Sequence, residues 1–253
     1  TNFASVSKDE KHKNIAIVFL SGTSGSPQSH KLLLETMIKN GFHVIALDYP
    51  NKYSVGSIAK NNLDEWENIR EEIVTGNDKT PLLNINKENA VIPLLNSVIK
   101  YLSEKEPEEN WSQYLNGNEV NWSKIITSGY SQGAGHAGYI ASKYNVYGSI
   151  LFSGPVDGRI EKPFESANWI KKDWKTDKSK IHIMVSKNDI FYNQIKENIN
   201  KIIITPTENN FIMTDDTPQN IAHFSTSEDA STPLNINKTP IYKDKWEKLM
   251  VFN

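Results

Sequence analysis

The sequence predicts an α/β fold in which a mostly parallel sheet is covered by helices on both faces. Short apolar runs alternate with helical patterns along most of the chain, and this alternation is typical of such sheets. The 253 residues are 38% apolar and 23% charged, which suits a globular protein with a substantial core. No Gly/Ser-rich or Pro-rich linker interrupts the pattern, so we expect a single domain over residues 1–253.

Each expected element follows from its local pattern. The run "NIAIVFL" at 14–20 predicts a buried strand, and 29–41 predicts a helix that Ser29 can cap and Gly41 ends. Further strands are expected at 42–49, 124–130, 146–154, 180–186 and 201–205, and further helices at 63–76, 86–107, 132–144, 190–200 and 244–252.

Two polar segments stand apart from this alternation. Residues 1–13 are expected to be flexible, and the first residue, Thr1, leaves open both a removed signal peptide and a trimmed terminus. Residues 50–85 are expected to form a cap-like excursion over the carboxyl edge of the sheet, where ligands bind in such folds.

Composition excludes several classes of function. The net charge is −2 and no basic block is present, so nothing indicates a nucleic-acid partner. The apolar runs are too short for a transmembrane segment. The chain has no cysteine, which excludes disulfides, thiolate metal sites and a cysteine nucleophile. No H-E-x-x-H or H-x-H pattern and no carboxylate cluster indicates a metal, and we expect no cofactor.

The segment "SGYSQGAGHAG" contains two overlapping glycine patterns. Residues 129–133 match G-x-S-x-G, and residues 133–138 match the dinucleotide-binding pattern G-x-G-x-x-G, with Asp157 at the distance of a ribose ligand. The apolar run ends near Thr127, so the turn lies at 129–133 and the later glycines fall within the helix. The segment therefore favours a nucleophilic serine, Ser131, on a sharp strand-to-helix turn.

A serine nucleophile needs an imidazole base and a carboxylate that orients it. In hydrolases with this turn the order along the chain is serine, acid, histidine. Of the six histidines, only His223 lies downstream in a polar loop, so we expect it to be the base. Asp189 follows the strand at 180–186 and is the favoured acid; Asp157 follows the preceding strand and is the alternative.

An oxyanion needs backbone N–H donors. The residue after the nucleophile, Gln132, is expected to supply one. The Gly- and Ser-rich loop "LSGTSGSPQSH" after the first strand is expected to supply the other from Thr23. The alternative interpretation of this loop is a plain glycine-rich connection.

Several other side chains could shape the site. Trp169 and Trp174 precede the strand that leads to Asp189 and could line a pocket. Arg70 could contact an anion, although a solvated helix face is the favoured interpretation of its segment.

Taken together, "FLSGTSGSP", "GYSQGAGHAGYIA", "ILFSGPVD" and "AHFSTSED" resemble the α/β-hydrolase superfamily. More narrowly, they resemble a bacterial group of uncharacterised serine hydrolases with a GHSQGGGHA-like elbow, from which this chain departs at Tyr130 and Ala134. The resemblance implies the α/β-hydrolase fold and a serine hydrolase acting on small-molecule esters. Members often carry export signals, which favours an exported mature chain. A peptidase or thioesterase with the same triad, or a non-catalytic binding protein on this scaffold, are the alternatives.

Overall fold

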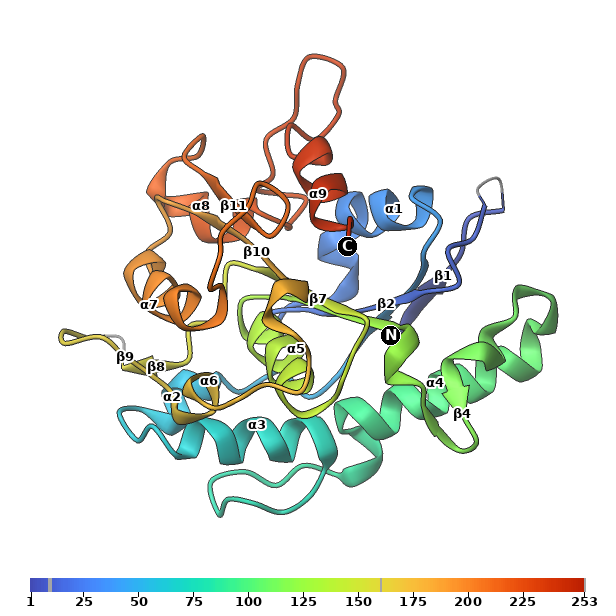
Figure 1. The fold of residues 1–253 in the computed structure, drawn as a ribbon, viewed down its shortest axis with the longest axis horizontal. Helices are drawn as coiled ribbons and strands as arrows, with labels where there is room; N and C mark the ends of the chain where they lie inside the picture. Colours follow the sequence, from blue (N-terminus) through green and yellow to red (C-terminus); the bar gives the residue numbers. More distant parts are fainter. Residues whose placement is uncertain (9–10, 160, 253) are drawn as a thin grey trace.

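A computed structural model describes residues 1–8, 11–159 and 161–252. A seven-stranded sheet with the strand order β1-β3-β2-β6-β7-β10-β11 forms the centre of the described chain (Figure 1). Strand β1 is antiparallel to β3, and every other neighbouring pair in this sheet is parallel. The carboxyl ends of the parallel strands therefore meet along one edge, where ligands bind in open α/β sheets.

The elements lie close to the positions that the sequence predicts. The strands of the main sheet are β1 (Phe3–Ser5), β2 (Ala16–Leu20), β3 (His43–Leu47), β6 (Ile125–Tyr130), β7 (Gly148–Phe152), β10 (Ile181–Ser186) and β11 (Phe211–Thr214). The helices are α1 (Lys31–Lys39), α2 (Val55–Ala59), α3 (Glu65–Thr75), α4 (Val91–Lys105), α5 (Gln132–Lys143), α6 (Asn168–Lys171), α7 (Tyr192–Ile202), α8 (Gln219–Ser225) and α9 (Lys243–Leu249). Two small hairpins complete the fold: β4 (Leu115–Asn116) with β5 (Glu119–Val120), and β8 (Gly158–Arg159) with β9 (Glu165–Ser166).

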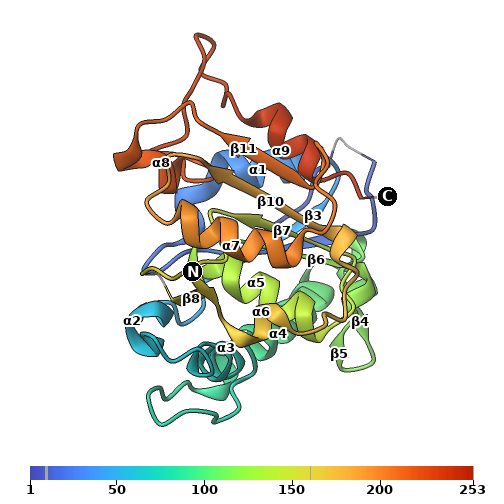
Figure 2. The same ribbon diagram turned by 60° about the vertical axis from the view of Figure 1, so that its left-hand side comes forward.

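Two apolar layers hold the helices against the sheet. Successive residues of a strand point to opposite faces, so Val18 and Leu20 of β2 join one layer and Ile17 and Phe19 join the other. The first layer contains residues of α3, α4, α5 and α7, and the second contains residues of α1 and α9. Figure 2 shows α1 and α9 on one side of the sheet and α3, α4 and α5 on the other. No helix of the described residues is long and apolar enough to cross a membrane.

Two expectations from the sequence need correction. Within the segment 1–13, residues Phe3–Ser5 pair with β3 as an edge strand, while residues 9–10 lie outside the described chain. The apolar residues at 201–205 do not form the last strand, because Ile202 and Ile203 pack in the core at the end of α7. Phe211–Thr214 takes the edge position beside β10 instead.

Residues 50–85, expected from the sequence to form a cap-like excursion, lie partly along the face of the sheet that α4 and α5 cover. They form α2 and α3, and α3 packs along α4 and α5 (Figure 1). The N-cap of α2 is Ser54, whose side chain accepts a hydrogen bond from the Ser57 amide. Trp66 and Ile69 of α3 are buried in the apolar layer beneath the sheet. The excursion is thus an integral part of the packed core.

Candidate active site

Ser131 lies on a sharp turn between β6 and α5. It has φ 53° and ψ −114°, a left-handed backbone conformation that is costly for any residue other than glycine. The Ser131 amide donates to the Phe152 carbonyl at 2.8 Å, which fixes the turn to the end of β7. A Cβ atom at Gly129 would lie 2.3 Å from the Gly133 carbonyl oxygen, and one at Gly133 would lie 1.9 Å from the Leu20 carbonyl oxygen. Both glycines are therefore required by close backbone approach.

A hydrogen-bonded chain runs from Ser131 through His223 to Asp189. Ser131 Oγ and His223 Nε2 are 2.9 Å apart, and His223 Nδ1 and Asp189 Oδ2 are 2.7 Å apart. Because an ionised carboxylate only accepts, Nδ1 carries the proton and leaves the Nε2 lone pair to face the serine hydroxyl. His223 lies within α8 rather than in a loop, which is a correction to the expectation from the sequence.

Asp157 contacts Arg70 instead of His223. The Arg70 guanidinium donates two hydrogen bonds to this carboxylate at 2.6 and 2.8 Å, and Trp169 Nε1 donates a third at 2.8 Å. Arg70 is 2% exposed, so the solvated helix face favoured from the sequence is wrong. Its remaining contact, from Nη1 to the Gln132 carbonyl at 2.7 Å, reaches the first residue of α5.

A glycine in α5 makes room for this guanidinium. A Cβ atom at Gly135 would lie 2.0 Å from Arg70 Nη2. The glycine pattern at 133–138 thus serves packing: Gly133 allows the helix to approach β2, and Gly135 admits the buried cation of α3. Two partners from distant segments, Arg70 and Asp157, meet beneath the turn as a result.

The loop after β2 lies against the serine turn. A Cβ atom at Gly22 would lie 3.3 Å from Ser131 Cβ. Thr23 Oγ1 donates to Gln132 Oε1 at 3.0 Å, and the Val55 amide donates to the same oxygen at 2.9 Å. Within residues 1–8, 11–159 and 161–252, the Thr23 amide has no hydrogen-bond acceptor. The amide of Gln132 lies in the first turn of α5, where no acceptor within the helix is available.

A cavity of about 150 Å³ opens beside Ser131. Apolar side chains from three segments form much of its wall, and the paired Arg70 and Asp157 also line it. Among the described residues that form its wall, Trp169 and Trp174 are absent; the two indole rings stack on each other with centroids 5.6 Å apart. The complete lining is Thr23, Ser54, Val55, Gly56, Trp66, Arg70, Ser131, Gln132, Val156, Asp157 and Phe191.

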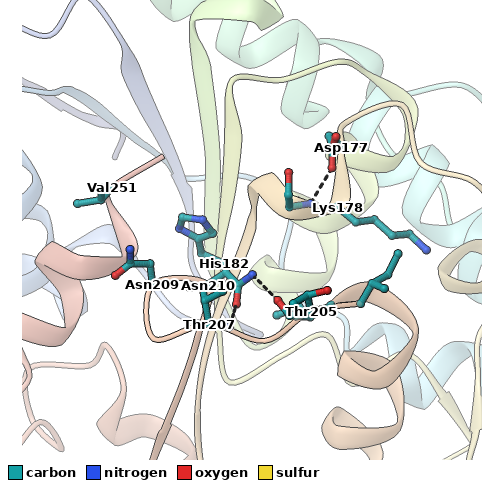
Figure 3. A pocket seen from close by; sticks show the side chains of 11 residues that line it. Asp177, Lys178, His182, Thr205, Thr207, Asn209, Asn210 and Val251 are labelled. Atoms are coloured by element: carbon teal, nitrogen blue, oxygen red, sulfur yellow. Dashed lines mark hydrogen bonds between the residues drawn. The ribbon is translucent and has the colours of Figure 1, made fainter. Parts of the chain in front are cut away.

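A larger cavity, of about 520 Å³, lies at the amino end of β10 (Figure 3). His182, near the amino end of β10, lines it together with Asn210 from the loop before β11. Asp189 follows the carboxyl end of β10, so this cavity is separated from the serine turn by the length of the strand. Its size alone does not make it a candidate for the chemistry.

His30 is a fully buried histidine close to the loop that contains Thr23. It ends the short helical turn Pro27–His30 after the Thr23 loop, and its Nδ1 lies 3.1 Å from the Ser227 carbonyl oxygen. Its ring packs against Phe19 and Tyr130. Burial lowers the pKa of His30 to about 4, although the Ser227 contact opposes this shift.

We expect His30 to make the fold acid-sensitive. Unfolded histidine binds its proton near pH 6.5, whereas folded His30 binds it only near pH 4. Between these pH values the unfolded state binds more protons than the folded state. The contribution of His30 to the free energy of unfolding is therefore intact above pH 6.5 and falls by roughly 3 kcal/mol as the pH drops to about 4. Denaturant unfolding of wild type and His30→Gln across this range tests it. The free energy of unfolding should fall less steeply with decreasing pH in the variant than in wild type. Equal pH dependence in the two proteins would contradict a role of His30 in acid sensitivity.

The comparisons with known proteins place the fold. No protein-family model matches the sequence, and no curated protein shows significant sequence similarity to it. Among solved structures, a mutant of the esterase rPPE superposes with a TM-score of 0.52 at 10% identity, over 98% of this chain and 76% of that chain. The chain has the α/β-hydrolase fold.

Two further solved structures show weaker similarity to this hydrolase fold. One is an alpha-beta serine hydrolase homologue from Coxiella burnetii, at 13% identity and a TM-score of 0.46 over 89% of each chain. The other is the thermophilic carboxylesterase EstE1 from a metagenomic library, at 10% identity and a TM-score of 0.47 over 99% of this chain and 90% of that chain.

Proposed function

We propose that the protein is a serine hydrolase that cleaves small or soluble carboxylic esters. The observation that carries this proposal is the chain of hydrogen bonds from Ser131 to His223 and from His223 to Asp189. The serine sits in a strained turn at the carboxyl edge of the sheet, beside a cavity that can receive an acyl group. Strain of this kind persists where the surrounding structure enforces it, and it clusters at active sites.

The proposed reaction proceeds through an acyl-enzyme. Ser131 Oγ attacks the ester carbonyl while His223 Nε2 takes its proton, and Asp189 stabilises the resulting imidazolium. The amides of Thr23 and Gln132 donate to the oxyanion of the tetrahedral intermediate. His223 then returns the proton to the leaving alkoxide, so that the alcohol departs. A water molecule, activated by the same imidazole, hydrolyses the acyl-enzyme and regenerates Ser131. None of these steps requires a cofactor.

The lining of the cavity supports small uncharged acyl groups. Val55, Trp66, Val156 and Phe191 offer apolar contact to an acyl chain. The charges of Arg70 and its partner carboxylate neutralise each other through two hydrogen bonds, so this wall offers no free charge to a substrate. A volume of about 150 Å³ is well below the 300–1,000 Å³ of pockets for drug-sized ligands. Short esters therefore suit the site better than long ones.

A fluorophosphonate probe tests the proposal. We expect the folded protein to be labelled on Ser131, and mass spectrometry of the labelled peptide locates the adduct. Ser131→Ala should lose the label, whereas Ser128→Ala, which changes a buried serine of the preceding strand β6, should keep it. An unlabelled wild-type protein, or equal labelling of wild type and Ser131→Ala, would refute a serine nucleophile. Hydrolysis of p-nitrophenyl esters, thioesters and peptide amides then separates an esterase from a thioesterase or peptidase.

A further inference from the structure

Three side chains of metal-binding type gather at the amino end of β3. His43 is the first residue of that strand, His12 precedes β2, and Glu109 ends the short helical turn Pro107–Glu109. Each residue offers one ligand atom, and the three atoms lie within 4.8 Å of one another. The residues are up to 97 positions apart in sequence, which explains why a search for local spacing patterns predicted no metal site.

Both imidazoles are held in the way that metal-binding histidines usually are. His12 Nε2 lies 2.6 Å from the Ser7 carbonyl oxygen, and His43 Nε2 lies 2.8 Å from the Glu109 carbonyl oxygen. A carbonyl only accepts, so Nε2 carries the proton in each neutral ring and the other nitrogen, Nδ1, keeps a lone pair. Histidine ligands characteristically donate their second ring N–H to a backbone carbonyl or carboxylate, which fixes the tautomer and the ring orientation.

The free nitrogen of His43 lacks a partner. His43 is fully buried, and its Nδ1 has no hydrogen-bond partner among the described residues. A buried polar atom without a partner costs free energy, so its presence calls for an explanation. Lys13 of the N-terminal segment does not donate to this nitrogen; its Nζ lies over the Phe42 ring, 4.4 Å from the centroid.

We propose that His12, His43 and Glu109 bind a divalent transition-metal ion, with zinc as the best match. Two imidazole nitrogens and one carboxylate oxygen suit Zn²⁺, whereas Mg²⁺ and Ca²⁺ prefer oxygen ligands throughout. A water molecule would complete the tetrahedron. In a tetrahedron with ligand atoms about 2.1 Å from zinc, two ligand atoms lie about 3.4 Å apart. The cluster, whose ligand atoms lie within 4.8 Å of one another, therefore closes by up to about 1.4 Å on binding, through His12 and Glu109, which lie outside the sheet.

The site is independent of the proposed hydrolase chemistry. It lies at the amino end of β3, and Ser131 follows the carboxyl end of β6, which is parallel to β2 and β3 in the same sheet. A metal there would join the N-terminal segment, β3 and the turn at 107–109. Because such a site exists only in the folded chain, binding stabilises the fold.

Zinc titration of the chelator-treated full chain tests this proposal. Isothermal titration calorimetry should give one Zn²⁺ per chain, and the melting temperature should rise with zinc. His12→Ala and Glu109→Gln should each weaken zinc binding at least about tenfold. Replacing a residue that only hydrogen-bonds to a metal ligand already costs about this much affinity, and loss of a ligand itself should cost no less. Both side chains are only partly buried, so these changes spare the core.

Glu108→Gln is the matched control, since Glu108 is exposed and adjacent to Glu109 but outside the cluster. It should bind zinc as wild type does. The proposal is overturned if wild type shows no stoichiometric binding at micromolar zinc, or if His12→Ala and Glu109→Gln bind as tightly as the control. Fluorophosphonate labelling of the same samples reports on the serine site separately, so failure of one proposal is distinguishable from failure of the other.

Discussion

Replacing Asp189 with asparagine is expected to lower kcat for ester hydrolysis by about 10⁴-fold, the size of loss seen when the acid of such a triad becomes an amide. The Asp189 carboxylate receives the proton of His223 Nδ1 at 2.7 Å. An amide can instead donate to Nδ1, which places the imidazole proton on Nε2 and removes the lone pair that faces Ser131. Steady-state kinetics with a short p-nitrophenyl ester measures the loss.

Two further aspartate variants complete this experiment. Asp215→Asn changes an exposed carboxylate in the loop after β11 and should leave kcat unchanged. Asp157→Asn should lower stability, because Asp157 accepts hydrogen bonds from Arg70 and Trp169. A 10⁴-fold loss in Asp157→Asn with normal stability, together with an active Asp189→Asn, would reverse the assignment of the acid.

Replacing Arg70 with leucine is expected to lower the free energy of unfolding by about 3–5 kcal/mol. The substitution leaves the Asp157 carboxylate, which is fully buried, without its cation. Breaking a buried pair from one side costs this much because the remaining charge stays desolvated. The Gln132 carbonyl also loses its donor. Urea unfolding of wild type and variant measures the difference.

Lys39→Met provides the comparison for an exposed ion pair. Lys39 and Glu35 lie 3.8 Å apart on α1 with side chains that are 72% and 54% exposed. Its loss should change stability by no more than about 0.5 kcal/mol. The double variant Arg70→Leu with Asp157→Leu removes both buried charges and should recover part of the loss. A stability for Arg70→Leu equal to that of Lys39→Met would contradict a buried, desolvated pair.

Features that depend on a local sequence pattern, such as the strand, turn and helix around Ser131, can be predicted from the sequence. The run "KIITSGYSQGAGHAG" contains a β-rich strand, glycines where backbone segments meet, and a helix, so the turn at Ser131 could be placed from sequence alone. His223 was reached by elimination among few histidines, and Asp189 by its position after a strand. The structure joins both side chains to Ser131 in one chain of hydrogen bonds, and their catalytic roles are part of the proposal above.

Other features depend on contacts between distant segments, which no local pattern reveals. Arg70 looks like part of a polar helix face in "NIREEI", and only the proximity of Asp157 and Gly135 explains its burial. The edge strand Phe211–Thr214 is short and follows a polar stretch, whereas the more apolar "KIIIT" before it packs as a helix end. Strand propensity depends on the packing context of a segment, so hydrophobicity alone does not identify an edge strand.

The side-chain oxygen of Gln132 receives one hydrogen bond from Thr23 and one from the amide of Val55, the first residue of α2. The segment over the cavity and the loop proposed to hold the oxyanion are thus joined at a single atom. The placement of the proposed oxyanion loop therefore depends on the placement of α2, through one side-chain oxygen of the residue that follows Ser131.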